Sequence, residues 1–520
     1  MPLSERPHER SARYVLALLA LCLLSRLPQL LGPRLFLDGD EATLGLMAKA
    51  LAQGRELPVF FWGQRYGFSL VEAAAGALAF RVAGVSAFGL KLSMLGLWTA
   101  GLLCLFFAQA RLMGARRGFW LTALLVLTPG WAVWSMKARG GYLTAFAVAG
   151  ALVWLLVEEQ RKPNSLKWLV AGVGTSVIYL AQPLWVPGVL PFLTVALLRR
   201  RRLLWTTGYV ATMVATLLLA RLAAAAGSGA WAGPPFEVLS YVVAAQEMAQ
   251  QIFTTMTGSY YLWWAIEPPG LATTALAACW YAAIPLTFAL QVYRVATRRF
   301  HPLSHLLFAS LWGTLVAEWL LLGARDPRYM LPIVAPLVLL AGVEFADLVE
   351  RRVLPAFVAT ALAAIMLVAG AGSMMEFGRF SFLWPNRPGS MPEAARIRQV
   401  VNYLDAHDVR HAYAANGLLA WQLMFYGDGN VIARSFDPVD RRPEFPRAVD
   451  HALVSGEPVA IVGFTNASGA PGCGGDPGCT GGIERLAPSP EHLFIVDGKY
   501  FVYADADRTL VEALKFRVWE

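Results

Sequence analysis

Three carboxylates, Asp38, Asp40 and Glu41, lie within four residues of one another, directly after the first long apolar run of the chain. A carboxylate held in partly apolar surroundings can take the proton from an attacking hydroxyl, and its oxygens also suit a divalent cation such as Mg²⁺ or Mn²⁺. The same residues suit the start of a helix, with Asp38 or Asp40 as the N-cap and Glu41 in the first turn. The stretch therefore fits either a catalytic or a capping role.

The elements that must position these residues are mostly membrane-spanning helices. Hydrophobic residues make up 57% of the 520 residues and charged residues 15%, a balance typical of a polytopic membrane protein. The net charge of +9 does not indicate nucleic-acid binding, because much of the Lys and Arg lies in short turns between apolar runs. The first apolar run lacks a clear signal-peptide cleavage site, so we expect it to stay as an anchor.

Apolar runs near the length that crosses about 30 Å of hydrocarbon predict about eleven transmembrane helices. The expected spans are 14–31, 88–110, 118–136, 141–157, 166–182, 184–198, 203–226, 271–293, 304–323, 329–347 and 353–371. With the N-terminus inside, every predicted inner turn is basic, whereas the outer loop 227–270 holds no Lys or Arg. The acidic stretch, in a long first loop of about residues 32–87, is therefore expected on the extracytoplasmic side. Within that loop, 42–51 and 69–82 are predicted as short interfacial helices.

A more polar segment begins at about residue 372 and is also expected outside. We predict helices at 393–406 and 418–426, strands at 411–415, 430–435 and 458–464, and a hairpin over 493–503. This alternation predicts a small extracytoplasmic α/β domain over 372–520, following a membrane domain over 1–371. Cys473 and Cys479 bracket a Gly-rich loop, and we expect them to form a disulfide because that loop is predicted to face an oxidising compartment.

The basic N-terminus, the first span and the outward motif Gly39-Asp40-Glu41-Ala42 together resemble the GT-C glycosyltransferases. The most similar branch uses polyprenyl-phosphate sugars and includes the protein O-mannosyltransferases and aminoarabinose transferases. The similarity continues through three further stretches, which are Gly63-Gln64-Arg65-Tyr66-Gly67, Lys137-Ala138-Arg139-Gly140-Gly141-Tyr142 and Arg328-Tyr329-Met330-Leu331-Pro332. It covers roughly residues 10–350 and does not extend to the C-terminal domain.

The resemblance implies specific roles for these residues. Asp40 is expected to be the general base for the acceptor hydroxyl, with Glu41 as its neighbour in the motif and Asp38 as a supporting carboxylate. The phosphate of a polyprenyl-phosphate sugar donor needs positive charge on the outer face. The residues expected to bind the donor are Arg65, Tyr66, Lys137, Arg139, Tyr142, Glu318, Arg328 and Tyr329. Snorkelling by the basic residues and aromatic anchoring by the tyrosines compete with these roles. The histidine-containing metal site of some relatives is not evident, which puts a metal requirement in doubt.

The expected function is inverting transfer of one sugar to a hydroxyl of a lipid, glycan or protein acceptor at the bacterial inner membrane. Phosphate is already a competent leaving group, so positioning and charge stabilisation are the main tasks of the protein. The alternatives are a transporter or flippase for lipid-linked sugars and a non-catalytic scaffold. A transporter predicts inverted repeats and charges near the bilayer midplane. The sequence shows no repeat and one candidate intramembrane carboxylate, Glu318, and therefore favours the transferase.

Overall fold

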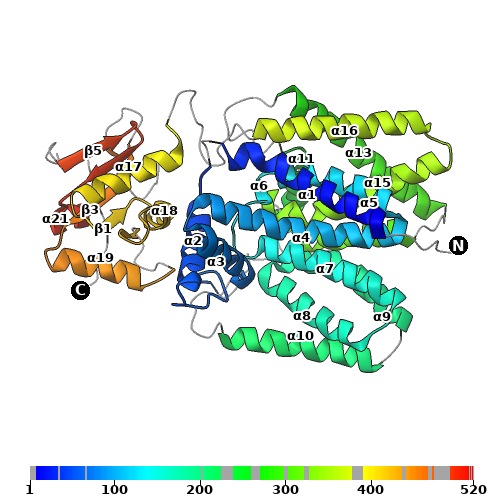
Figure 1. The fold of residues 1–520 in the computed structure, drawn as a ribbon, viewed down its shortest axis with the longest axis horizontal. Helices are drawn as coiled ribbons and strands as arrows, with labels where there is room; N and C mark the ends of the chain where they lie inside the picture. Colours follow the sequence, from blue (N-terminus) through cyan, green and yellow to red (C-terminus); the bar gives the residue numbers. More distant parts are fainter. Residues whose placement is uncertain are drawn as a thin grey trace.

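The computed structural model describes residues 8–32, 35–64, 67–200, 203–223, 238–258, 270–297, 302–320, 327–377, 391–435, 441–465, 471–472, 492–514, 516 and 518. A large helical bundle occupies one end of the molecule and a small α/β domain the other (Figure 1). Helices α2 (Gly39–Ala52) and α3 (Leu70–Ala83) lie at the end of the bundle that faces this domain. Both match the short helices predicted in the first loop.

Seven helices within the described ranges are long and apolar enough to cross a membrane, which makes the chain a multi-pass membrane protein. They are α1 (His8–Leu30), α4 (Ala87–Met113), α7 (Tyr142–Arg161), α13 (Leu271–Ala296), α14 (Pro302–Leu320), α15 (Leu331–Glu350) and α16 (Ala356–Phe377). The other bundle helices are α5 (Ala115–Val126), α6 (Gly130–Trp134), α8 (Ser165–Ala181), α9 (Val186–Arg200), α10 (Leu203–Ala223) and α11 (Val238–Thr257), with short 3₁₀ turns η1 (Pro183–Trp185) and η2 (Pro327–Met330). The predicted count of eleven spans is not confirmed.

The predicted span at 118–136 differs most from the structure, because it breaks into α5 and α6. Pro129 lies at the break, where it lacks an N–H and disfavours helical geometry in the residue before it. At the break, the Trp131 carbonyl accepts from the Ser135 N–H at 3.1 Å, and a buried arginine adds further hydrogen bonds. Arg26 of α1, which is fully buried, donates to Val126 O (3.0 Å), Trp131 O (3.2 Å) and Ser135 Oγ (2.9 Å). Arg26 therefore links the last residue of α5 to α6 and to Ser135, inside an apolar bundle.

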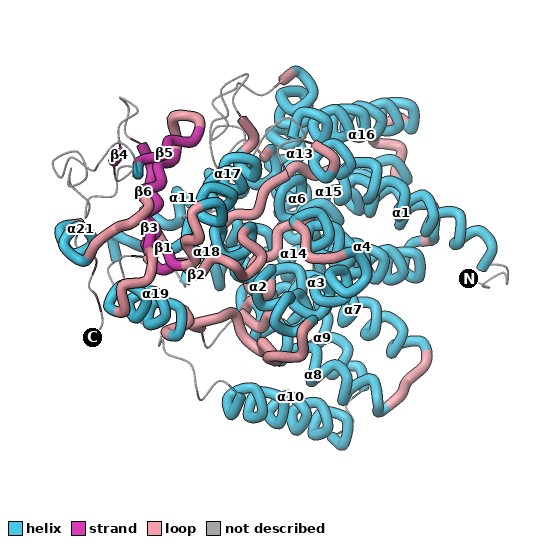
Figure 2. Tube along the Cα trace, turned by 60° about the vertical axis from the view of Figure 1, so that its left-hand side comes forward, coloured by secondary structure: helices cyan, strands magenta, loops and turns pink. Residues whose placement is uncertain are grey.

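The C-terminal domain has the predicted α/β architecture. Its elements are α17 (Glu393–Ala406), β1 (His411–Ala414), α18 (Gly417–Tyr426), β2 (Ile432–Arg434), α19 (Glu444–Val454), β3 (Val459–Thr465), β4 (Pro471–Gly472), β5 (Leu493–Val496), β6 (Tyr500–Tyr503) and α21 (Arg508–Ala513). The described strands form one mixed sheet in the order β2-β1-β3-β6-β5, with β4 paired to β3. Strand β1 is parallel to β2 and β3, whereas β6 is antiparallel to β3 and β5. Figure 2 shows these strands with α17 to α19 packed beside them. Helices α19 and α21 were not predicted.

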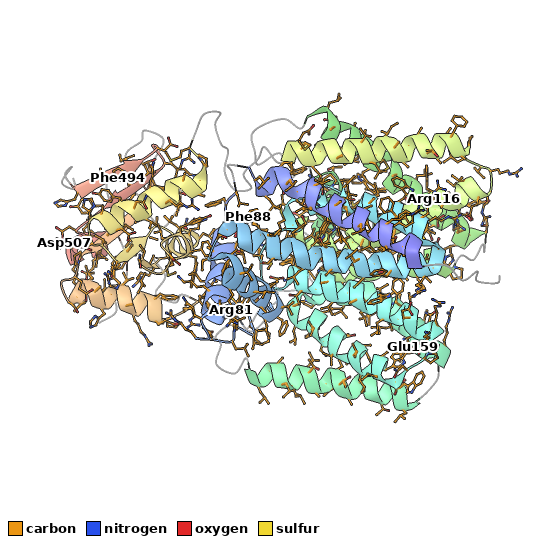
Figure 3. The ribbon with its side chains drawn as sticks, viewed as in Figure 1. Arg81, Phe88, Arg116, Glu159, Phe494 and Asp507 are labelled. Carbon is orange, nitrogen blue, oxygen red and sulfur yellow. The ribbon has the colours of Figure 1, made fainter. Side chains whose placement is uncertain are left out.

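The residues at the two ends of the bundle can be compared with the predicted membrane topology. Arg116 and Glu159 lie at the end far from the C-terminal domain, whereas Arg81 lies at the near end (Figure 3). Arg116 is the second residue of α5 and belongs to the basic turn predicted between the spans 88–110 and 118–136, which is expected to be cytoplasmic. The acidic motif and this turn thus occupy opposite ends of the bundle. The division at residue 371 and the direction of the chain across the membrane stay predictions.

Candidate active site

The acidic motif forms the N-terminus of α2. Asp38 is the N-cap: its Oδ1 accepts from the Glu41 N–H at 2.9 Å, and its own N–H donates to Glu41 Oε2 at 3.2 Å. This reciprocal capping box explains why the helix starts here, and the acidic first turn also complements the positive end of the helix dipole. The capping interpretation of Asp38 is therefore correct, and it does not exclude a second role for the motif.

All three carboxylates are buried, and two of them, Asp38 and Glu41, face lysines from other parts of the bundle. Lys137 Nζ lies 2.5 Å from Asp38 Oδ2, and the Lys137 side chain is 1% exposed. Glu41 pairs with Lys91 of α4 and accepts from the Ala138 N–H at 3.2 Å. Burial favours a higher pKa for Asp38, but the charges of Lys137 and Arg139 and hydrogen bonds from Lys137 and Glu41 hold that pKa well below its usual range. These contacts hold the N-terminus of α2 against the turn after α6.

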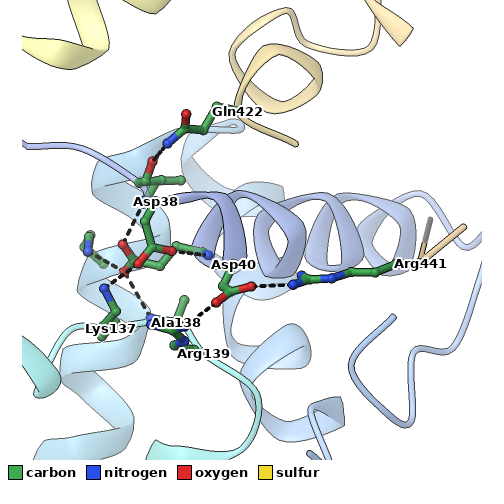
Figure 4. Close-up of polar contacts among 10 residues, drawn as sticks. Asp38, Asp40, Lys137, Ala138, Arg139, Gln422 and Arg441 are labelled. Atoms are coloured by element: carbon green, nitrogen blue, oxygen red, sulfur yellow. Dashed lines mark hydrogen bonds and ion pairs between the residues drawn. The ribbon is translucent and has the colours of Figure 1, made fainter. Parts of the chain in front are cut away.

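Asp40 has different surroundings. Its Oδ2 lies 2.6 Å from Arg139 Nη2, and its Oδ1 lies 2.6 Å from Nη2 of Arg441, which comes from the C-terminal domain (Figure 4). The two arginine side chains are 27% and 26% exposed, and Asp40 is the most exposed of the three acids. Asp40 is therefore the carboxylate of the motif that a substrate can approach.

The turn that carries Lys137 and Arg139 is held in place by Glu72 of α3. Glycine at 141 has φ = 90°, and a side chain there would meet Ala181 of α8, so the turn can pack directly against that helix. Glu72 is fully buried and accepts the N–H groups of Leu143 (3.0 Å) and Thr144 (3.2 Å) at the start of α7. Burial raises the pKa of Glu72 from 4.5 to about 7, and these backbone hydrogen bonds limit the rise.

The C-terminal domain docks onto α2 through α18. Gln422 donates to Leu37 O at 3.1 Å, and the Leu37 N–H donates to the Tyr426 hydroxyl at 3.2 Å. A side chain at Gly39 would come within 2.5 Å of the Leu418 Cα, so the helices touch at this point. The domain thus contacts the residues directly before and inside the acidic motif.

The structure brings Asp38, Asp40, Glu41, Lys137 and Arg139 together, and the roles expected for them stay predictions. Lys137, however, is buried against Asp38, so in this arrangement it does not face a site where a donor phosphate could bind.

The remaining predicted residues lie elsewhere or outside the described residues. Tyr142 is the first residue of α7, where it is buried beside Trp134. Arg328 donates to the Tyr329 hydroxyl at 3.0 Å in η2. Glu318 is fully buried in α14, and its carboxylate oxygens have no hydrogen-bond partner among the described residues. Four predicted residues lie outside the described residues: Arg65, Tyr66, Cys473 and Cys479.

Three site residues were not identified from the sequence: Lys91, Glu72 and Arg441. A single Lys near the start of α4 and a single Glu in an Ala-rich helix carry no spacing that indicates a site. Arg441 lies 401 residues from Asp40 in the chain and belongs to a domain that resembled no family.

A divalent ion does not fit the acidic motif as the structure arranges it. Each carboxylate already faces at least one Lys or Arg, which supplies the positive charge that a metal would bring. Within the described ranges, no group of three or more His, Cys, Asp or Glu side chains is close enough to hold a metal ion. The chemistry proposed below therefore uses only the side chains of the chain.

The bundle also contains an apolar cavity between α4, α7, α9, α14 and α15. Among the residues that line it are Leu105, Phe146, Trp185, Phe192, Leu307 and Leu339. Phe146 lies one turn into α7 from Tyr142, so the cavity begins close to the turn that carries Arg139.

Comparison with solved structures shows which known folds the chain shares. No family model matches the sequence, and no curated protein matches it. The ArnT structures from Cupriavidus metallidurans, apo and bound to undecaprenyl phosphate, are each 14% identical, cover 96% of this chain and 98% of theirs, and have TM-scores of 0.56 and 0.55.

An oligosaccharyltransferase from Archaeoglobus fulgidus, in complex with Zn and sulfate, is 12% identical over 85% of this chain and 67% of its own, with a TM-score of 0.52. The arabinofuranosyltransferase AftD from Mycobacteria is 16% identical over 88% of this chain and 36% of its own, with a TM-score of 0.50. At these identities the likeness concerns the fold alone, and it confirms the fold that the sequence resemblance implied. The chain has the fold of the GT-C membrane glycosyltransferases.

Proposed function

We propose that the protein transfers one sugar from a polyprenyl-phosphate donor to the hydroxyl of an extracytoplasmic acceptor, with Asp40 as the general base. The observation that carries this proposal is the position of Asp40. It is the most exposed acid in a cluster whose other two members pair with lysines, and arginines that are about one quarter exposed flank it on both sides.

The proposed reaction needs one base and one anion site. The acceptor hydroxyl gives its proton to Asp40 while its oxygen forms a bond to the anomeric carbon. The bond from that carbon to the phosphate oxygen breaks, and the electron pair leaves with the polyprenyl phosphate. Arg139, beside Asp40, is placed to stabilise the negative charge of this leaving group. Attack opposite to the leaving phosphate inverts the configuration at the sugar.

The supporting residues then have structural tasks. Lys137 and Lys91 hold Asp38 and Glu41, which sets the orientation of the first turn of α2 and therefore of Asp40. Glu72 and the Gly140-Gly141 turn set the position of Arg139. Such preorganisation is effective because misplacement by about 1 Å can cost on the order of 100-fold in rate.

The apolar cavity of the bundle is chemically suited to part of the polyprenyl chain of the donor. A polyprenyl chain is apolar, and the cavity that begins near the arginine turn is lined almost entirely by apolar side chains. The GT-C fold is shared with ArnT, one structure of which contains undecaprenyl phosphate. The opposite placement of the basic turn and the acidic motif supports an active site on the extracytoplasmic side of a bacterial inner membrane. Arg65, Tyr66, Tyr142, Glu318, Arg328 and Tyr329 remain proposed donor ligands.

The proposal is tested with purified protein in lipid nanodiscs. Polyprenyl-phosphate-linked sugars are supplied with an extract of envelope glycans, lipids and proteins, and mass spectrometry follows both the released polyprenyl phosphate and the glycosylated product. We expect release and product formation in equal amounts, with inverted anomeric configuration. Movement of intact donor between the leaflets of proteoliposomes, without any product, would favour the flippase instead.

A further inference from the structure

Asp40 is held by two arginines from different parts of the chain, and they are not equivalent. Each acid of the motif has one cation from the membrane bundle: Lys137 for Asp38, Lys91 for Glu41 and Arg139 for Asp40. Arg441 is a second cation for Asp40 and comes from the C-terminal domain. It can therefore leave Asp40 without leaving that carboxylate unpaired, because Arg139 keeps Oδ2.

The guanidinium of Arg441 contacts residues of α2 and of the first loop. Its Nη2 lies 2.6 Å from Asp40 Oδ1, its Nη1 lies 3.2 Å from Thr43 Oγ1, and its Cζ lies 4.8 Å from the centre of the Phe61 ring. Contact with an aromatic face supports a guanidinium through cation–π attraction. The side chain is 26% exposed, so a soluble headgroup can reach it.

The backbone at Arg441 is docked on the first loop. Gly63 has φ = 73°, and a side chain there would come within 2.6 Å of the Arg441 Cα. The next residue, Arg442, pairs with Glu56 at 2.5 Å and lies over the Trp62 ring at 4.6 Å. The segment is thus fixed to the loop at the backbone, while the Arg441 guanidinium reaches into the site.

We propose that Arg441 is a positioning residue that exchanges partners during the reaction. Before the donor binds, it occupies Asp40 Oδ1. When the donor phosphate arrives, Arg441 moves to the phosphate, and Oδ1 becomes free to accept the proton of the acceptor hydroxyl. The C-terminal domain would then make the base available only when the leaving group is already in place. This inference rests on the proposed function, because it takes the ligand to be a polyprenyl phosphate.

The exchange predicts that Asp40 and phosphate compete for Arg441. The test measures binding of undecaprenyl phosphate to the purified protein in nanodiscs, by tryptophan fluorescence, and needs no turnover. Arg441→Ala should weaken binding roughly tenfold, as expected for a lost charge-assisted hydrogen bond. Asp40→Asn should tighten binding, because it removes the negative charge that competes with phosphate for the two arginines. In the double variant Arg441→Ala with Asp40→Asn, most of this gain should disappear.

Arg442→Ala is the matched control, since it removes a neighbouring arginine from the same interface without touching Asp40. Equal weakening by the two alanine variants would overturn the exchange, because the effect would then come from domain docking in general. Unchanged binding of undecaprenyl phosphate in Arg441→Ala would also overturn the exchange. So would an equal gain in affinity from Asp40→Asn in the wild type and in the Arg441→Ala variant. If the wild type binds undecaprenyl phosphate with this pattern but transfers no sugar, the proposed function fails and the exchange stands. If the wild type does not bind it, both fail.

Discussion

Replacement of Lys137 by Met tests whether this lysine holds the motif or binds the donor. The substitution keeps a long apolar stem and removes the charge. Lys137 and Asp38 are 1% and 5% exposed and 2.5 Å apart, so the variant leaves a buried carboxylate without its nearest cation. Breaking a buried ion pair in this way costs about 3–5 kcal/mol. The Glu41 N–H and the end of α2 still stabilise Asp38, so we expect the lower part of this range.

The double variant Lys137→Met with Asp38→Asn removes both charges and keeps a capping side chain at position 38. Because Asn caps a helix about as well as Asp, we expect it to recover most of the loss and to unfold within about 1–2 kcal/mol of the wild type. Stability is measured by unfolding in mixed detergent micelles at pH 7, followed by tryptophan fluorescence. The Michaelis constant for the donor is measured on the same samples.

A different pattern would refute this reasoning. If Lys137→Met unfolds at the same denaturant concentration as the wild type while the donor Michaelis constant rises, then Lys137 contacts the phosphate in the working enzyme. The donor-binding role of Lys137 that the family resemblance implies would then hold. The buried ion pair between Lys137 and Asp38 would not be present in the enzyme during turnover.

Three further predictions concern other parts of the molecule. The raised pKa of Glu72, about 7, means that the stability gained from its protonated form is present at low pH and lost as the pH rises towards 7. Glu72→Gln should remove this pH dependence, and above pH 7 its free energy of unfolding should exceed that of the wild type by up to about 3 kcal/mol. An equal loss of unfolding free energy in the variant at pH 5 and at pH 8 would contradict this prediction. Arg26→Met should lower the unfolding free energy by about 2–4 kcal/mol, because the Val126 carbonyl, the Trp131 carbonyl and Ser135 Oγ each lose a buried hydrogen bond. An unchanged unfolding midpoint would contradict this role of Arg26. Alkylation of the denatured, unreduced protein, read by mass spectrometry, should leave Cys473 and Cys479 unmodified, and labelling of both would disprove the disulfide.

Local sequence signals predicted much of the fold. The acidic triplet before an apolar stretch predicted the start of α2. Apolar periodicity bounded by turn residues predicted α17, α18 and five described strands of the C-terminal domain, whereas β4 was not predicted. These elements depend on capping and patterning within about ten residues, which a sequence displays directly. The break between α5 and α6 was missed because an apolar run has the same composition whether its helix is continuous or interrupted. The Pro129-Gly130 pair was the local indication of a break.

The site was predicted only in part for a different reason. The motif and the Lys137–Arg139 turn were both identified. The sequence around a lysine, however, does not show whether its side chain binds phosphate or is buried against a carboxylate. Packing of α2 against the turn decides between them. The contact from Arg441 joins two domains across 401 residues and has no local pattern at all.

The central claim is that Asp40 is the base of the transfer, and the most direct test is Asp40→Asn. The amide keeps the size of the side chain and can still accept from one arginine, so the unfolding midpoint should stay close to that of the wild type. The control is Asp428→Asn, which makes the same change at another acid on the domain interface, one that pairs with Lys49. Release of polyprenyl phosphate from the sugar donor should fall roughly 100-fold or more in Asp40→Asn, the usual contribution of a general base, and remain at the wild-type rate in the control. A wild-type rate in folded Asp40→Asn would contradict the account.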